Sequence, residues 1–170
     1  MHQVFTVGYE AATPEAFDSE LLAHGVELVV DVRAVAASRR AGFSKRSLSE
    51  HLSEAGIDYV HLRGLGDPKA GRVAARAGYW QEFRRIFAAQ MSSAEAKSDL
   101  AKLVALVRSQ RVALLCYEAD PATCHRSIVA AEVARIANVE VAHLHVSTAK
   151  SAELGPSRAN HHPGESRAAP

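Results

Sequence analysis

Residues 112–144 carry the clearest signal of the fold and read VALLCYEADPATCHRSIVAAEVARIANVEVAHL. This stretch opens with an apolar run typical of a strand buried on both faces, and a polar loop follows. Val129, Val133 and Ile136 then recur at the spacing of a helix face. Residues 139–144 return to a strand pattern. The stretch therefore predicts a strand, a crossover helix and a second strand of a parallel sheet.

The same alternation extends upstream of this stretch. Thr13 and Ser44 stand where the N-caps of two helices belong, and Gly25 and Gly56 stand where those helices should end. Each helix lies between apolar runs that have the length and composition of buried strands. These runs are residues 4–7, 27–32 and 57–62.

A longer segment separates the third strand from the strand at 112–116. Its first part, residues 63–78, is Gly-rich and basic, and we interpret it as a solvated connection. An amphipathic helix then carries Tyr79 and Phe83. Ser92 and Glu95 have the spacing of a capping box at the start of one more helix.

Strands that alternate with helices predict a three-layer α/β/α, doubly wound (Rossmann-like) single domain with a mostly parallel sheet of about five strands. We predict the strand order 3-2-1-4-5, with the ligand crevice beyond the carboxyl ends of the first and fourth strands. The domain is expected to span residues 1–146. Residues 147–170 lack apolar periodicity and are predicted to be a disordered tail, in which His161 and His162 form a poor metal site.

Composition bears on the ligands that the protein can attract and on its cell compartment. The formal net charge of the 170 residues is +1, so only local clusters of charge can attract an anion. Two sparse cysteines are typical of reduced intracellular thiols. We therefore expect a cytoplasmic protein without a membrane segment, cofactor or metal. The oligomeric state is not fixed by the sequence.

The loop after the second strand is strongly basic. No acidic residue occurs between Asp31 and Glu50, a property that favours binding of phosphate or another anion. The alternative is a solvated surface on which Arg33 pairs with Asp31 or Glu118. The cations of this loop are Arg33, Arg39, Arg40, Lys45 and Arg46. A second basic set, Arg63, Lys69, Arg72 and Arg76, is interpreted as part of the solvated connection.

The segment CYEADPATCHR at residues 116–126 concentrates reactive side chains. Asp120 or Thr123 can cap the helix that follows, which places Cys124 and its neighbours at a helix N-terminus. Such a terminus favours anions and lowers the pKa of a thiol. Glu118, just past a central strand, is the best candidate for an acid or base. The alternative for both cysteines is simple packing in the core.

The motifs of three well-defined kinds of site do not fit this segment. A protein-phosphatase loop needs an arginine six positions after its cysteine, where Ala122 and Ala130 stand. A rhodanese loop is not matched either, although residues 31–33 resemble the Asp-Val-Arg of rhodaneses. A zinc site would have enough ligands, but it lacks the usual spacing. Its ligands would be Cys116, Cys124, His125 and His61.

Five motifs together resemble the DUF488 family of small bacterial and archaeal α/β proteins. They are TVGY at 6–9, DVR at 31–33, SRRAGFSK at 38–45, DYVHL at 58–62 and CYEADPATCHRS at 116–127. Tyr9 and Glu10 replace the His-Ser pair that is common in the family. The resemblance names no substrate. It implies that one pocket gathers Asp31, Arg33, Arg39, Arg40, Lys45, Glu118, Cys124, His125 and Arg126.

Our first hypothesis is an enzyme, a hydrolase or transferase, acting on a phosphate-bearing or other anionic substrate such as a nucleotide or a nucleic-acid end. Its catalytic residues would be Glu118, Cys124 and His125. Its substrate-binding residues would be Tyr9, Asp31, Arg33, Arg39, Arg40, Lys45, Cys116 and Arg126. The alternatives are a non-catalytic module that binds nucleic acid or nucleotide, and rhodanese-like cysteine chemistry.

Overall fold

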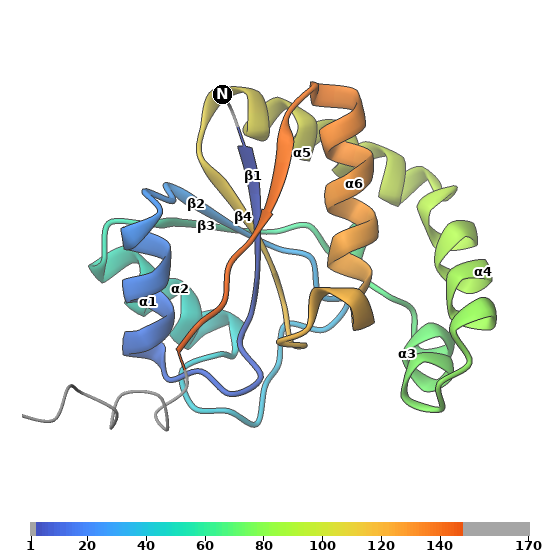
Figure 1. The fold of residues 1–170 in the computed structure, drawn as a ribbon, viewed down its shortest axis with the longest axis horizontal. Coiled ribbons are helices and arrows are strands. Elements are labelled where there is room, and N and C mark those ends of the chain that lie inside the picture. Colours follow the sequence, from blue (N-terminus) through green and yellow to red (C-terminus); the bar gives the residue numbers. More distant parts are fainter. Residues whose placement is uncertain (1–2, 148–170) are drawn as a thin grey trace, which may run out of the picture.

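The computed structural model describes residues 3–147 (Figure 1). In chain order the strands are β1 (Gln3–Gly8), β2 (Leu28–Asp31), β3 (Asp58–His61), β4 (Val112–Cys116) and β5 (Glu140–His143). The helices are α1 (Pro14–Ala23), α2 (Lys45–Glu54), α3 (Lys69–Arg76), α4 (Trp80–Met91), α5 (Ala94–Ser109) and α6 (His125–Ala137). Two short 3₁₀ turns, η1 (Arg63–Leu65) and η2 (Pro121–Thr123), lie in the connections.

The five strands form one parallel sheet in the order β3-β2-β4-β1-β5. The predicted order 3-2-1-4-5 is therefore wrong, because β1 and β4 exchange places. The central position goes to β4, all of whose residues are buried. β1 carries Gln3 and Thr6, and the Thr6 hydroxyl contacts the outermost strand through His143. The most apolar strand thus occupies the middle of the sheet, as burial on both faces requires.

Helices cover both faces of the sheet, which confirms the three-layer α/β/α prediction (Figure 1). On one face, Phe17 and Leu21 of α1 join Leu48 and Leu52 of α2 in a core that also contains alternate residues of the strands. On the other face, α4, α5 and α6 build a second core against the remaining strand residues. The two cores clamp β4, so the carboxyl end of this strand is held rigidly.

The helix signals of the sequence are partly confirmed. The Thr13 hydroxyl accepts a hydrogen bond from the Ala16 amide and begins α1, and Gly25 follows that helix with φ +62°. α5 is capped by Ser93 rather than by Ser92, because the Ser92 hydroxyl donates back to a carbonyl of α4. Either serine could cap α5, but the Ser92 hydroxyl is already bonded to α4, which leaves Ser93 as the cap.

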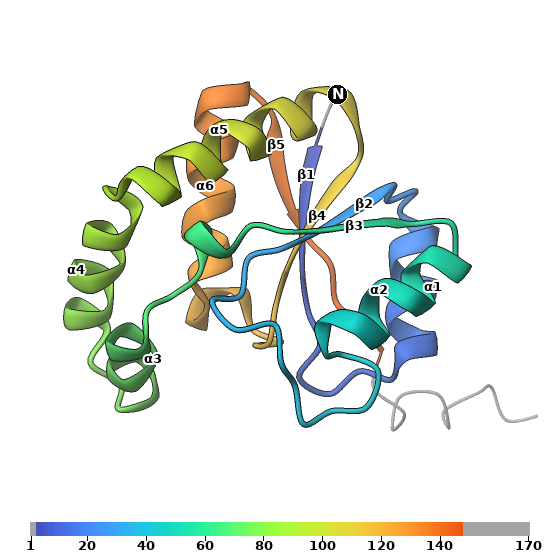
Figure 2. The same ribbon diagram turned by 180° about the vertical axis from the view of Figure 1, so that it is seen from behind.

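The basic segment at 63–78 is more than the solvated connection that its composition predicts, since it contains η1 and α3. Pro68 occupies the N-cap position of α3, and the buried Ala74 packs in the core with α4. Figure 2 shows α3 and α4 side by side beyond the sheet. This pair forms a wall above the carboxyl ends of the strands, where the candidate site lies.

Between residues 3 and 147, no helix is both long enough and apolar enough to cross a membrane. The predicted tail beyond residue 147, with His161 and His162, lies outside the described residues. The boundary at residue 146 therefore stays a prediction.

Candidate functional site

A pocket of about 500 Å³ opens at the carboxyl ends of β1, β2 and β4. Its lining comes from Tyr9 after β1, the loop 33–40 after β2 and the start of α6. The remaining lining comes from residues 116–118 at the end of β4, from Asp67, from α3 and from Phe83 of α4. The volume lies within the range of small-molecule and cofactor sites, roughly 300–1,000 Å³. We call this cavity the arginine pocket, because five arginines line it: Arg33, Arg39, Arg40, Arg72 and Arg76.

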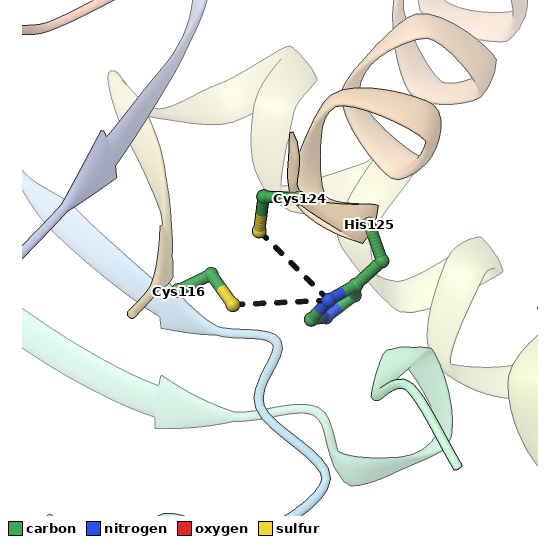
Figure 3. A group of neighbouring side chains, drawn as sticks. All are labelled: Cys116, Cys124 and His125. Atoms are coloured by element: carbon green, nitrogen blue, oxygen red, sulfur yellow. Dashed lines mark hydrogen bonds between the residues drawn. The ribbon is translucent and has the colours of Figure 1, made fainter. Parts of the chain in front are cut away.

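Two thiols and an imidazole meet at the floor of the arginine pocket (Figure 3). Cys116 ends β4, Cys124 is the N-cap of α6 and His125 is the first residue of that helix. The Nδ1 atom of His125 lies 3.7 Å from the Cys116 sulfur and 3.9 Å from the Cys124 sulfur. All three side chains are buried. The floor thus holds three reactive atoms within 4.8 Å of one another.

The orientation of the His125 ring is fixed from behind. Its Nε2 lies 2.7 Å from the carbonyl oxygen of Val32, which can only accept a hydrogen bond. Nε2 therefore carries a proton, and in the neutral ring Nδ1 presents its lone pair to the two sulfurs. The ring of Phe87 packs at a centroid distance of 5.4 Å. Packing and the carbonyl together hold the ring in place.

Glu118 completes the floor. The Cys116 thiol donates a hydrogen bond to Glu118 Oε2 over 3.0 Å. Burial alone would raise the pKa of Glu118, but hydrogen bonds from the Cys116 and Cys124 thiols hold it below the ordinary value. The floor therefore carries a carboxylate that is stabilised by thiol donors.

The pKa values of Cys124 and His125 depend on each other. Burial raises the pKa of the Cys124 thiol well above its ordinary value. Burial alone would lower the pKa of His125, but the Cys124 sulfur and the Val32 carbonyl raise it. The part of this rise in pKa that comes from the Cys124 sulfur requires negative charge on that sulfur, and the Asp67 carboxylate adds to the rise. Because burial favours the neutral thiol, we assign a neutral Cys124 and a neutral His125.

Arg33 and Asp31 form a buried ion pair that ties strand ends together. The Arg33 guanidinium binds both Asp31 carboxylate oxygens, at 2.8 and 2.6 Å, and also donates to the Tyr9 hydroxyl and the Phe43 carbonyl. Asp31 also accepts from the Tyr59 hydroxyl. Most of the Arg33 donors are thus occupied by the protein. This is the pairing with Asp31 that the sequence left open as the alternative to anion binding.

The other four arginines of the arginine pocket have no carboxylate partner within residues 3–147. Arg40 donates to the Ala12 carbonyl over 2.6 Å, but its Nε is buried without a hydrogen-bond partner. Arg72 donates to the Asp67 carbonyl. Arg39 and Arg76 are exposed at the rim. We call Arg39, Arg40, Arg72 and Arg76 the wall arginines.

Three predicted substrate-binding residues do not line the arginine pocket. Asp31 is fully buried behind Arg33, and Lys45 is exposed at the start of α2. Arg126 is fully buried, and its guanidinium donates to the carbonyl oxygens of Glu118 and Ala119. This arginine holds the loop between β4 and α6. The predicted residues that do line the pocket are Tyr9, Arg33, Arg39, Arg40, Cys116, Glu118, Cys124 and His125.

Comparison with known proteins identifies the family. A family model described as "Domain of unknown function DUF488" matches residues 13–133. The chain belongs to the DUF488 family. No curated protein and no solved structure matches the chain significantly. Within this DUF488 chain, the matched range contains every residue of the arginine pocket except Tyr9.

Sequence reasoning missed Asp67, Arg72 and Arg76 of the DUF488 pocket, because the composition of segment 63–78 is that of a solvated loop. Asp67 lies on the pocket wall, and its Oδ1 is buried without a hydrogen-bond partner. Burial raises its pKa to about 6, against the attraction of His125 and Arg72. The regular spacing of Arg72 and Arg76, one helical turn apart, could have revealed that both face the same way.

His61 does not join the two cysteines, although the zinc alternative included it. Its Nε2 lies 2.7 Å from the Arg33 carbonyl oxygen. Within the described part of the DUF488 chain, the only group of three or more potential metal ligands is Cys116, Cys124 and His125.

The N-cap of α6 also differs from the two candidates. Asp120 caps η2 instead, where its carboxylate accepts from the Ala122 amide. The Cys124 sulfur itself accepts the Arg126 amide at the start of α6, over 3.5 Å. The intervening 3₁₀ turn moves the start of the helix to the cysteine, so a thiol stands at the positive end of the helix dipole.

Proposed function

We propose that this DUF488 protein is an enzyme, a hydrolase or transferase, that binds a phosphate-bearing or other anionic substrate in the arginine pocket. One observation carries the proposal. The wall arginines lack carboxylate partners within residues 3–147 and stand around a floor of Cys116, Glu118, Cys124 and His125. Cationic walls over reactive side chains are the arrangement that an enzyme for anionic substrates needs.

The wall arginines differ from three arginines on exposed helix surfaces. Arg46, Arg85 and Arg135 each pair with a glutamate one helical turn away. Such pairs are typical of solvated helix surfaces. The buried Nε of Arg40 without a partner costs free energy unless a ligand supplies an acceptor. A phosphate has oxygens in the geometry that guanidinium groups bind bidentately.

The volume of the arginine pocket favours a ligand that is larger than a phosphate ion. Its volume of about 500 Å³ leaves room beyond one anionic group. Tyr117 lines the pocket, is exposed, and packs edge-on against Tyr9 at a centroid distance of 5.4 Å. An exposed aromatic face can stack with a nucleobase. We therefore favour a nucleotide or a nucleic-acid end as the substrate.

The chemistry would take place at the floor. The wall arginines would hold the anionic group and stabilise negative charge that develops on it. Cys124, His125 and Glu118 would act on the bound group, because they line the same cavity. Glu118 is the group best placed to accept a proton, since it already accepts a hydrogen bond from the Cys116 thiol.

A thermal-shift panel tests this proposal. The ligands are inorganic phosphate, pyrophosphate, nucleoside mono- and triphosphates and short oligonucleotides, with sodium chloride at matched ionic strength as the blank. A ligand at about a hundred times its Kd should add about 3 kcal/mol of stability, a rise in Tm of roughly 5–10 °C. The double variant Arg39→Ala/Arg76→Ala should lose this rise.

Arg135→Ala is the matched control, because it also removes a guanidinium but lies toward the other end of α6. It should keep the full ligand effect. A rise with nucleotides that Tyr117→Ala reduces, while phosphate is unaffected, would identify the base-binding wall. A rise with oligonucleotides alone, steeply weakened by salt and without turnover, would favour the non-catalytic module. No rise with any of these anions would refute the proposal.

A further inference from the structure

We propose that Cys116, Cys124 and His125 form a binding site for a thiophilic divalent cation, with zinc as the first candidate. The fourth coordination position would face the arginine pocket. This inference goes beyond the proposed function and stands on the floor geometry alone, so the metal site and the anion site can each fail without the other.

The donor atoms already lie near the positions that zinc requires. Tetrahedral bonds of about 2.3 Å to sulfur and about 2.0 Å to nitrogen put sulfur and nitrogen roughly 3.6 Å apart. The two observed sulfur to Nδ1 distances are 3.7 and 3.9 Å. All three donor atoms lie within 4.8 Å of one another. The two sulfur to nitrogen distances therefore exceed the value for bound zinc by only a few tenths of an ångström.

The imidazole is oriented as a metal ligand from outside the site. A ligating histidine usually donates its second ring N–H to a carbonyl or carboxylate, which fixes the tautomer and the ring. His125 does so through Nε2 and the Val32 carbonyl oxygen. Its Nδ1 lone pair therefore points at the place where the cation would lie, as Figure 3 shows for the three side chains.

The helix dipole of α6 favours a metal-bound thiolate at Cys124, whose thiol burial keeps neutral before a cation binds. Cys116 is the last residue of the central strand, and Cys124 caps α6, where the helix dipole favours negative charge. The sulfur of Cys124 also accepts the Arg126 amide. Metal binding would release the two thiol protons to solvent and form two metal–sulfur bonds.

Three protein ligands and an open position are typical of catalytic rather than structural zinc. Two thiolates and one neutral imidazole also cancel the charge of a divalent cation. The cation and its three ligands would then add no net charge to the floor, whose remaining negative charge is the Glu118 carboxylate. The cation could polarise an oxygen of that ligand or a bound water. Glu118, next to Cys116, lies where it could exchange a proton with that water.

Metal titration of the reduced full-length chain tests the site. The protein is stripped with a chelator under reducing conditions, and then Co²⁺ is added as a spectroscopic substitute for Zn²⁺. We expect saturation at one cobalt per chain with an intense sulfur-to-cobalt charge-transfer band, which Zn²⁺ then abolishes. Because the chain has only two cysteines, the band itself reports their ligation.

Variants locate the site. Cys116→Ser and Cys124→Ser should each reduce the band, because one cysteine ligand remains, and weaken zinc binding by at least the roughly 10–100-fold that loss of an outer-shell partner costs. Arg39→Ala/Arg76→Ala should keep the band, which separates this test from that of the anion site. His161→Ala/His162→Ala should also keep it, since those histidines could bind metal by themselves.

Two outcomes would overturn the metal site. One is the absence of a sulfur-to-cobalt band in the reduced wild-type chain, a result that does not depend on any variant folding. The other is binding that persists in Cys124→Ser but disappears in His161→Ala/His162→Ala.

Discussion

Arg33 and Arg39 are six positions apart in one basic loop, yet their surroundings are opposite. Arg33 is buried and gives its donors to Asp31, Tyr9 and Phe43. Arg39 is exposed at the rim of the arginine pocket and pairs with no carboxylate within residues 3–147. Charge clustering in the sequence predicts that such a loop is basic. It does not distinguish the arginine that holds the fold from the arginine that is free to hold a ligand.

These surroundings predict different costs for removing each side chain. Arg33→Met leaves the Asp31 carboxylate buried without its counter-charge and should lower the free energy of unfolding by about 3–5 kcal/mol. Arg39→Ala should change it by no more than about 0.5 kcal/mol. Urea unfolding of both variants measures the difference. Equal midpoints for the two variants would show that the Arg33–Asp31 pair does not hold the strand ends together.

At the scale of elements, the loop between β4 and α6 is the part that builds the floor. β1 ends at Gly8, which pairs in register with Cys116. A Cβ at Gly8 would lie 1.8 Å from the Glu118 carbonyl oxygen. The same carbonyl accepts a hydrogen bond from Arg126. Because Gly8 has no side chain, the loop can pack directly against the end of β1. The buried Arg126 guanidinium holds the same loop from α6.

Gly8→Ala should consequently disturb both stability and the site. Forcing a methyl group against this backbone should cost about 1–3 kcal/mol and displace Glu118. Gly56→Ala is the control, because Gly56 has φ +76° but a methyl group there would meet no neighbour within 4 Å. It should cost roughly 1–2 kcal/mol through backbone strain alone and leave ligand effects unchanged. If Gly8→Ala kept the full thermal shift with phosphate-bearing ligands, the loop would not position the site.

The elements also show what the sequence could and could not predict. Caps, glycines and apolar runs are local signals, and they placed α1, α2 and all five strands. The exchange of β1 and β4 is a non-local property that depends on which strand buries both faces best. The sequence did not predict α3, because its basic composition is typical of a solvated loop. The helix packs on α4 and buries a single alanine, so its apolar pattern is weak. Missing α3 also meant missing Arg72 and Arg76 of the pocket.

At the scale of the whole molecule, the two cores position one pocket at the carboxyl end of the sheet. Motifs far apart in the sequence predicted this location, since Tyr9 and Arg33 follow β1 and β2, and Cys116 ends β4 between them. The sequence did not predict how deeply each side chain would be buried. Asp31 and Arg126 carry charges but lie behind the pocket, where they hold its walls. A motif identifies residues that a family shares. Only the packed structure shows which of them line the pocket and which lie behind it and hold its walls.

The function that we propose requires the wall arginines to attract anions to the thiols at the floor. Alkylation of the reduced, metal-free chain tests it without a known substrate, because iodoacetate is an anion and iodoacetamide is a neutral reagent of similar size. The measured quantity is the ratio of the two reaction rates at the pocket cysteines. We predict that this ratio falls on the order of tenfold in Arg39→Ala/Arg76→Ala and is unchanged in Arg135→Ala. An equal ratio in all three proteins would contradict the claim that the pocket is built to draw anions to its floor.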